Sequence, residues 1–184
     1  MLSDIKLTED IFYLENSWVW RDFSSGRSGA VGRMLIIGFG NLLMGDDGAG
    51  VHLIQKLTNQ ALPPQVELLD GGVCSFAALG ELQSASLAIL VDSMTGGGNP
   101  GDIYRLTADQ LDCGQPTKAL SVHDFSLLDS LRVAQQTGTL PPVIIYGIEP
   151  ACLDLSLELS TLVDLAVDTV IARIMADIGS AVRQ

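Results

Sequence analysis

Basic residues are scarce in this sequence. Ten Lys and Arg stand against 22 Asp and Glu in 184 residues, so the formal net charge is −12. Binding to nucleic-acid phosphates needs clustered Lys and Arg, whereas the ten basic residues here are scattered along the chain. This composition argues against a nucleic-acid-binding protein.

Long apolar runs and paired cysteines are also missing. No run reaches the roughly 18 apolar residues of a membrane-spanning helix, and the first residues lack the basic start and apolar segment of a secretory signal. The three cysteines (Cys74, Cys113 and Cys152) are far apart and form no C-x-x-C motif. This pattern favours free thiols in a reducing compartment. We therefore expect a cytoplasmic, monomeric protein that does not associate with membranes.

The composition that remains is that of a globular protein, with 47% hydrophobic and 17% charged residues. Residues 1–33 differ from the rest because they contain both tryptophans and half of the ten aromatic residues. Their charge is only −1, from four basic and five acidic residues, and they end in a Ser- and Gly-rich stretch typical of a linker. We predict an N-terminal appendage over 1–33 and the functional domain over 34–184. We also expect this domain to fold without the appendage.

The order of apolar patterns predicts an α/β fold. Apolar or alternating runs predict five strands, at 34–37, 66–70, 87–92, 102–106 and 143–148. Helical spacing predicts helices at 51–57, 76–82, 123–136 and 159–178, the last with Ser160 as its N-cap. The connection before 102–106 is too short for a crossover helix, which predicts an antiparallel edge strand there. Together these elements predict a three-layer sandwich with a mostly parallel, twisted, five-stranded sheet.

A glycine-rich loop, residues 38–50, follows the first predicted strand and contains the adjacent acids Asp46 and Asp47. In open α/β sheets, ligands bind beyond the carboxyl ends of the strands. A dinucleotide-binding G-x-G-x-x-G motif would need glycine where this chain has Leu43, and two carboxylates at the start of the next helix would repel a pyrophosphate. Asp70 could still take the place of the acid that binds ribose. A nucleotide-binding Rossmann-like module is therefore an alternative with weak support.

Acidic residues at strand ends are also suited to binding a metal. Asp47 follows the first predicted strand, Asp92 ends the third, and His123 lies near a predicted helix start. Two carboxylates and one imidazole suit Zn, Ni, Mn or Fe better than a metal that prefers thiolates. Three protein ligands leave positions open for substrate or water. A metallohydrolase acting on a small molecule is a second alternative for such a site.

Each candidate residue also has a structural interpretation. Asp47, together with Asp46, could cap the following helix, and Asp92 could accept hydrogen bonds from the next loop. His123 could cap a helix as well. A nucleophilic pair of Cys74 and His123 is conceivable, but nothing in the sequence marks the thiol as activated.

A resemblance to a known family adds to these observations. The loop reads G-x-G-N-x-L-x-x-D-D-G-x-G over 38–50 and resembles the N-terminal signature of the hydrogenase maturation proteases. These endopeptidases trim a C-terminal extension from the large subunit of nickel–iron hydrogenases. Four further segments resemble the family in the expected order: Leu69–Gly72, Val91–Asp92, Ser121–His123 and Tyr146–Pro150.

The resemblance implies roles for individual residues. It implies that Asp47, Asp92 and His123 are the metal ligands and catalytic residues, whereas Asp46 is not a ligand. It also implies a role in substrate docking for the D-G-G turn, Asp70, Gly71 and Gly72. The sequence departs from the family at Val73, where the family often has Thr, and in the extension over 1–33.

By the same resemblance, the partner is a large-subunit precursor that already carries nickel, so the substrate rather than the free protein supplies the metal. Cleavage follows nickel insertion, because a precursor without nickel offers no ion for the three ligands. The residues leave open whether the metal also polarises the scissile carbonyl or activates water.

Overall fold

The computed structural model describes residues 32–73, 80–107, 127, 131, 134–135 and 140–182. Its strands are β1 (Met34–Phe39), β2 (Val66–Gly72), β3 (Leu87–Ser93), β4 (Ile103–Thr107) and β5 (Val143–Ile148). Its helices are the 3-10 helix η3 (Gly45–Gly48), α1 (Ala49–Thr58) and α4 (Thr161–Val182). Within this part of the chain no helix is long and apolar enough to cross a membrane.

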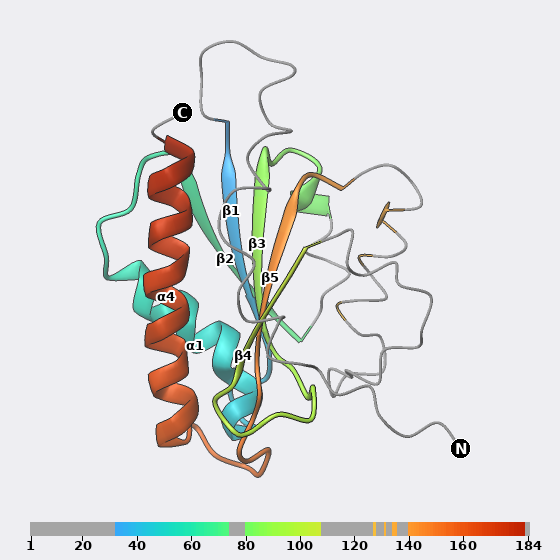
Figure 1. Ribbon diagram of the computed structural model, residues 1–184, viewed down its shortest axis with the longest axis vertical. Coiled ribbons are helices and arrows are strands. Elements are labelled where there is room, and N and C mark those ends of the chain that lie inside the picture. The colour runs from blue at the N-terminus through green and yellow to red at the C-terminus, as the bar shows by residue number, and fades with distance from the viewer. Residues whose placement is uncertain are drawn as a thin grey trace. The chain divides into compact units, whose positions relative to one another are not determined.

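The five strands form one twisted sheet in the order β2-β1-β3-β5-β4 (Figure 1). β1 pairs in parallel with β2 and β3, and β3 pairs in parallel with β5. β4 is an edge strand and runs antiparallel to β5. The mostly parallel sheet and its single antiparallel edge strand confirm the prediction from the sequence.

Both faces of the sheet are covered, as expected for strands that are apolar throughout. Helices α1 and α4 pack together on one face (Figure 1). On the other face, alternate residues of β1, β3 and β5 form a buried cluster with Leu82, Leu127 and Leu131. These three leucines come from segments in which helices were predicted, and each is helical in the structure. The sheet thus lies between two outer layers, which confirms the three-layer architecture.

Most predicted boundaries agree with the structure to within two residues. β1 is longer than predicted because Gly38 and Phe39 continue to pair with β2, across a register shift. The apolar spacing of the last helix also predicts that Leu162 lies on its buried stripe, and this prediction is wrong. The stripe that begins at Val163 faces the sheet, and Leu162 lies to one side of it and is exposed. Most of the predicted helices 76–82 and 123–136 lies outside the described residues.

The predicted appendage, 1–33, also lies outside the described residues, except for its last two positions. Arg33 pairs with Glu67 at 2.8 Å and with Glu81 at 3.0 Å, and its guanidinium also donates to the hydroxyl of Ser84. The backbone carbonyl of Arg33 accepts hydrogen bonds from Ser86. The residue directly before β1 is therefore bonded to the start of β2 and to the segment that leads into β3.

Glycines allow the start of α1 to lie directly on the sheet. A Cβ at Gly50 would be 2.3 Å from the carbonyl oxygen of Val91 and 2.4 Å from that of Phe39. A Cβ at Gly40, where φ is +130°, would be 1.8 Å from the carbonyl oxygen of Asp47. The glycine motif of the loop thus brings the backbone around Asp47 against the ends of β1 and β3.

Replacing Gly50 with alanine should lower the free energy of unfolding by about 3 kcal/mol, because backbone oxygens of two strands would have to move. Urea unfolding measures the change. Gly80→Ala is the control, since a Cβ there meets nothing within 4 Å, and this variant should gain up to about 1 kcal/mol. Equal stability of the Gly50→Ala variant and the unsubstituted protein would show that the close approach is not needed.

Candidate functional site

The candidate site lies where the strand order reverses. The chain passes from β1 to β2 on one side of β1 and then to β3 on its other side. In α/β sheets this reversal opens a crevice at the carboxyl ends of the two strands, and ligands bind there. Asp47 lies in η3, just beyond β1, and Asp92 is the sixth residue of β3. The structure therefore brings these two predicted site residues to the same edge.

We refer to Asp47 and Asp92 as the carboxylate pair. Both side chains are buried, with 4% of each residue exposed. An Oδ of Asp47 accepts a hydrogen bond from the backbone N–H of Asn41 at 3.0 Å, and an Oδ of Asp92 accepts one from the N–H of Ser93 at 2.8 Å. The second bond comes from the last residue of β3, whereas the amides of Gly96 and Gly98 in the following loop donate to Glu149. The predicted bonds from Asp92 to that loop are therefore not the ones seen here. The bond from Ser93 engages one oxygen of Asp92 and is compatible with a further ligand.

The electrostatics of the pair are unfavourable for two ionised acids. Burial raises the pKa of Asp92 to about 8, and the negative charge of Asp47 is the second cause of that rise. The hydrogen bond from Ser93 opposes the shift but does not cancel it. Near neutral pH the Asp92 carboxyl thus retains its proton unless a cation joins the site. Two buried acids with this mutual repulsion fit a divalent cation, which would compensate both charges.

Asp46 has a different role from its neighbour. It is 1% exposed, and its carboxylate accepts four hydrogen bonds from a segment more than a hundred residues later in the chain. The donors are the N–H groups of Ala151 and Cys152, both at 2.9 Å, and the N–H and hydroxyl of Ser160, at 2.7 and 2.8 Å. With its oxygens engaged in this way, Asp46 holds the segment before α4 against the glycine-rich loop.

Ser160 therefore differs in part from its prediction as the N-cap of the last helix. Its carbonyl accepts the first helical hydrogen bond, from the N–H of Asp164 at 2.9 Å, which is what an N-cap backbone does. Its hydroxyl donates to Asp46. The side chain thus joins two segments of the protein through this bond.

The D-G-G turn, predicted to dock substrate, lies at the carboxyl end of β2. The carboxylate of Asp70 accepts a hydrogen bond from the N–H of Gly72 at 2.9 Å, and the carbonyl of Gly72 accepts one from the N–H of Gly40 at 2.9 Å. A Cβ at Gly71 would be 2.5 Å from the ring of Phe39. The turn is therefore bonded to the loop that carries Asp47, and its role in docking stays a prediction.

His123, Cys74 and Cys113 lie outside the described residues. Within the part of the chain that is described, no group of three His, Cys, Asp or Glu side chains is arranged to hold a metal ion. The structure therefore brings together two of the three predicted ligands, and the place of His123 stays a prediction.

Sequence reasoning missed Glu149, which is 5% exposed and follows β5. Its carboxylate accepts hydrogen bonds from the N–H of Gly96 at 2.7 Å, the N–H of Gly98 at 3.3 Å and the hydroxyl of Tyr104 at 2.5 Å. Burial and this bond to Glu149 raise the pKa of Tyr104 to about 12. Glu149 thus fixes the loop that follows Asp92. The signals in the sequence were its position directly after a predicted strand and its place within the family-like segment Tyr146–Pro150.

Known proteins share this fold and this sequence pattern. The sequence profile of the hydrogenase maturation proteases matches residues 51–177, a range that includes Asp92 and His123 and begins four residues after Asp47. The chain belongs to the hydrogenase maturation protease family. A putative hydrogenase maturation protease of Methanocaldococcus jannaschii is 32% identical over 148 residues, which cover 79% of this chain and 96% of that protein.

Other relatives agree with this assignment. The hydrogenase 2 maturation protease of Escherichia coli K12 is 27% identical over 146 residues, covering 78% of this chain and 89% of that protein. The chain spans only 59% of the length of HupD, a hydrogenase expression/formation protein of Rhodobacter capsulatus, with 32% identity over 124 residues and 66% of this chain covered. Some members of the family, such as HupD, therefore extend well beyond the part that matches this chain.

Solved structures of the family have the same fold. The hydrogenase maturating endopeptidase HybD from E. coli superposes with a TM-score of 0.70 and 26% identity, over 81% of this chain and 93% of that one. The [NiFe] hydrogenase maturation protease HycI from Thermococcus kodakarensis superposes with a TM-score of 0.64 and 26% identity, over 82% and 94% of the two chains.

Proposed function

We propose that this protein is an endopeptidase that removes the C-terminal extension of a nickel–iron hydrogenase large-subunit precursor after nickel has been inserted. Asp47, Asp92 and His123 bind the nickel that the precursor carries, so the metal belongs to the substrate. The family and its named relatives support the reaction class. A precursor without nickel has nothing for these ligands to bind and is not processed.

The observation that carries the proposal is the carboxylate pair. Burying two acids together is costly unless a cation or a proton compensates their charge. Among the described residues, the charge that acts on Asp92 is that of Asp47, which has the same sign. At high pH, where both acids are ionised, this repulsion destabilises the folded, metal-free protein. A divalent cation delivered by a partner removes the repulsion.

The position of Leu127 supports His123 as the third ligand. Leu127 is 3% exposed and belongs to the same buried cluster as Leu90 and Met94. These two residues lie two positions before and after Asp92, and in a strand such positions share a face. Four residues of chain span at most roughly 14 Å, so the Cα atom of His123 is no farther than this from the Cα atom of Leu127.

The two histidines of the chain offer a matched test. Purified protein is incubated with nickel-loaded precursor, and the mass of the large subunit is followed by mass spectrometry. His123→Ala should lower the rate of processing about a hundredfold or more, whereas His52→Ala should process like the unsubstituted protein. Circular dichroism shows that each variant is folded.

Two results would contradict parts of the proposal. If the unsubstituted protein leaves the nickel-loaded precursor uncut, the assignment of the reaction is wrong. If it cuts nickel-free and nickel-loaded precursor at the same rate, the metal is not what the site recognises. In the latter case, titration with Ni²⁺ should also show the same binding for the unsubstituted protein and for His123→Ala.

A further inference from the structure

We propose that three exposed leucines next to the candidate site receive the C-terminal extension of the precursor; this inference rests on the proposed function. The leucine patch consists of Leu43, Leu155 and Leu157. They are 57%, 81% and 66% exposed, which makes them three of the six large apolar residues that lie most open to solvent among the described residues. Exposed apolar residues gathered at one place mark sites of interaction.

The backbone places the three leucines together. Met44 and Ser156 form an isolated parallel bridge, in which the N–H of Gly45 donates to the carbonyl of Ser156 and the N–H of Ser156 donates to the carbonyl of Leu43. Leu155 and Leu157 flank Ser156, and Leu43 directly precedes Met44, so each of the three leucines is next in sequence to one of the two paired residues.

The patch is held rigidly although it lies on loops. The hydrogen bonds that Ala151, Cys152 and Ser160 donate to the Asp46 carboxylate fix both ends of the segment that contains Leu155 and Leu157. The hydroxyl of Ser156 also accepts a hydrogen bond from the N–H of Glu158 at 3.0 Å. Apolar side chains on a preorganised backbone lose little further freedom on binding, which favours affinity.

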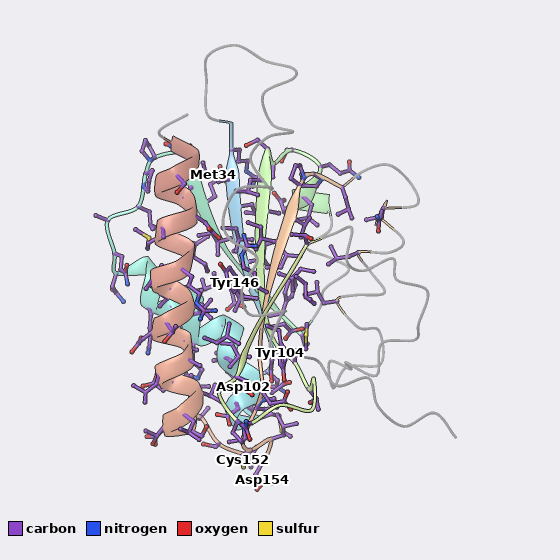
Figure 2. All side chains as sticks on the ribbon, in the orientation of Figure 1. Met34, Asp102, Tyr104, Tyr146, Cys152 and Asp154 are labelled. Atoms are coloured by element: carbon purple, nitrogen blue, oxygen red, sulfur yellow. The ribbon has the colours of Figure 1, made fainter. Side chains whose placement is uncertain are left out.

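The patch is continuous with the candidate site. The N–H of Leu43 donates to the side chain of Asn41, whose own N–H donates to Asp47. Leu43 precedes Asp47 by four residues, a distance of at most roughly 14 Å along the chain. Cys152 and Asp154, from the segment that carries the other two leucines, lie at the end of the sheet to which β1 runs from Met34 (Figure 2).

This location indicates which part of the precursor is bound. If the carboxylate pair engages nickel in the mature part of the substrate, the scissile bond and the extension beyond it must continue within a few residues of the pair. An extension that is to be removed reaches the protease as a peptide, and its apolar side chains can cover the leucines. Residues 149–160 contain no Lys or Arg, whereas Asp154 and Glu158 are exposed beside the patch. The complementary peptide therefore carries apolar residues and a basic one.

The test compares the double variant L155A/L157A with L165A, which removes an exposed leucine (59%) from the outer face of α4. Steady-state processing of nickel-loaded precursor should show about a tenfold increase in KM for L155A/L157A, with kcat within about twofold of the unsubstituted protein. L165A should keep both constants. Binding to the processed large subunit, which lacks the extension, should be equal for all three proteins.

Each other outcome overturns the inference. An unchanged KM shows that the patch does not bind substrate, and a lower kcat with an unchanged KM shows that it only supports the fold of the site. Weaker binding of L155A/L157A to the processed subunit assigns the patch to the folded body of the partner. If sedimentation shows a dimer that these substitutions dissociate, the patch binds a second copy of the chain. If the unsubstituted protein does not cut the precursor at all, the proposed function fails and the inference fails with it.

Discussion

Replacing Asp92 with asparagine should stabilise the metal-free protein and at the same time slow processing by about a hundredfold or more. The raised pKa of Asp92, about 8 compared with an ordinary value of 3.8, means that the folded protein holds a proton that the unfolded chain releases. Between these two pH values the folded state binds more protons, so the stability that this group contributes falls as pH rises. Asparagine does not titrate, so the variant avoids that loss.

The expected difference in unfolding free energy is small near pH 4, grows through neutral pH and levels off above pH 8. At pH 8 it should be on the order of a few kcal/mol in favour of Asp92→Asn. Urea unfolding in the presence of a chelator at pH 5, 6.5 and 8 measures this trend. Glu158→Gln, which removes a negative charge from an exposed acid, is the control variant for the loss of one carboxylate.

In the processing assay, Asp92→Asn should lose about a hundredfold or more in rate, because even the outer partners of metal ligands are worth about 10- to 100-fold. The two measurements separate the roles of the residue. A stability difference that is constant with pH would show that Asp92 is ionised in the folded protein. Processing at an unchanged rate would show that Asp92 does not bind the metal.

The framework of the fold could be predicted because its signals are local. β5 matches its predicted range at both ends, since the run from Val143 to Ile148 is apolar and is bounded by Pro142 and Glu149. The edge position of β4 followed from a connection too short for a helix. In contrast, the end of β1 was missed because Gly38 has no side chain to continue the apolar pattern, although its backbone still pairs with Asp70.

The site could be predicted only in part. The rule that ligands bind at the carboxyl ends of strands pointed to the acids that follow β1 and end β3, and the family resemblance then favoured Asp47 over Asp46. The roles of Asp46 and Glu149 depend on donors 45 to 114 residues away in sequence. Hydrogen bonds of such range leave no periodic trace in the sequence, so the pattern of residues alone does not distinguish Asp46, a buried anchor, from Asp47, the proposed ligand.

The second large effect is expected at Asp46. In Asp46→Ala, the N–H groups of Ala151, Cys152 and Ser160 lose their charged acceptor. A hydrogen bond to a charged group contributes about 1.5–3 kcal/mol, and water replaces part of it because Ala151 and Cys152 are exposed. We expect the free energy of unfolding to fall by about 3–5 kcal/mol. Asp46→Asn should lose most of the same amount, because its amide nitrogen cannot accept hydrogen bonds.

A control variant and a second measurement show whether Asp46 specifically holds the segment before α4 or stabilises the whole domain. Asp154→Ala removes an exposed acid from the same segment and should change stability by less than about 0.5 kcal/mol. Hydrogen exchange at the amides of Cys152 and Ser160 should accelerate in Asp46→Ala well beyond the change at core amides such as Ile89. If all amides accelerate equally, Asp46 stabilises the whole domain without specifically holding the segment before α4. Because that segment carries Leu155 and Leu157 next to the carboxylate pair, its release should also raise the KM for the precursor.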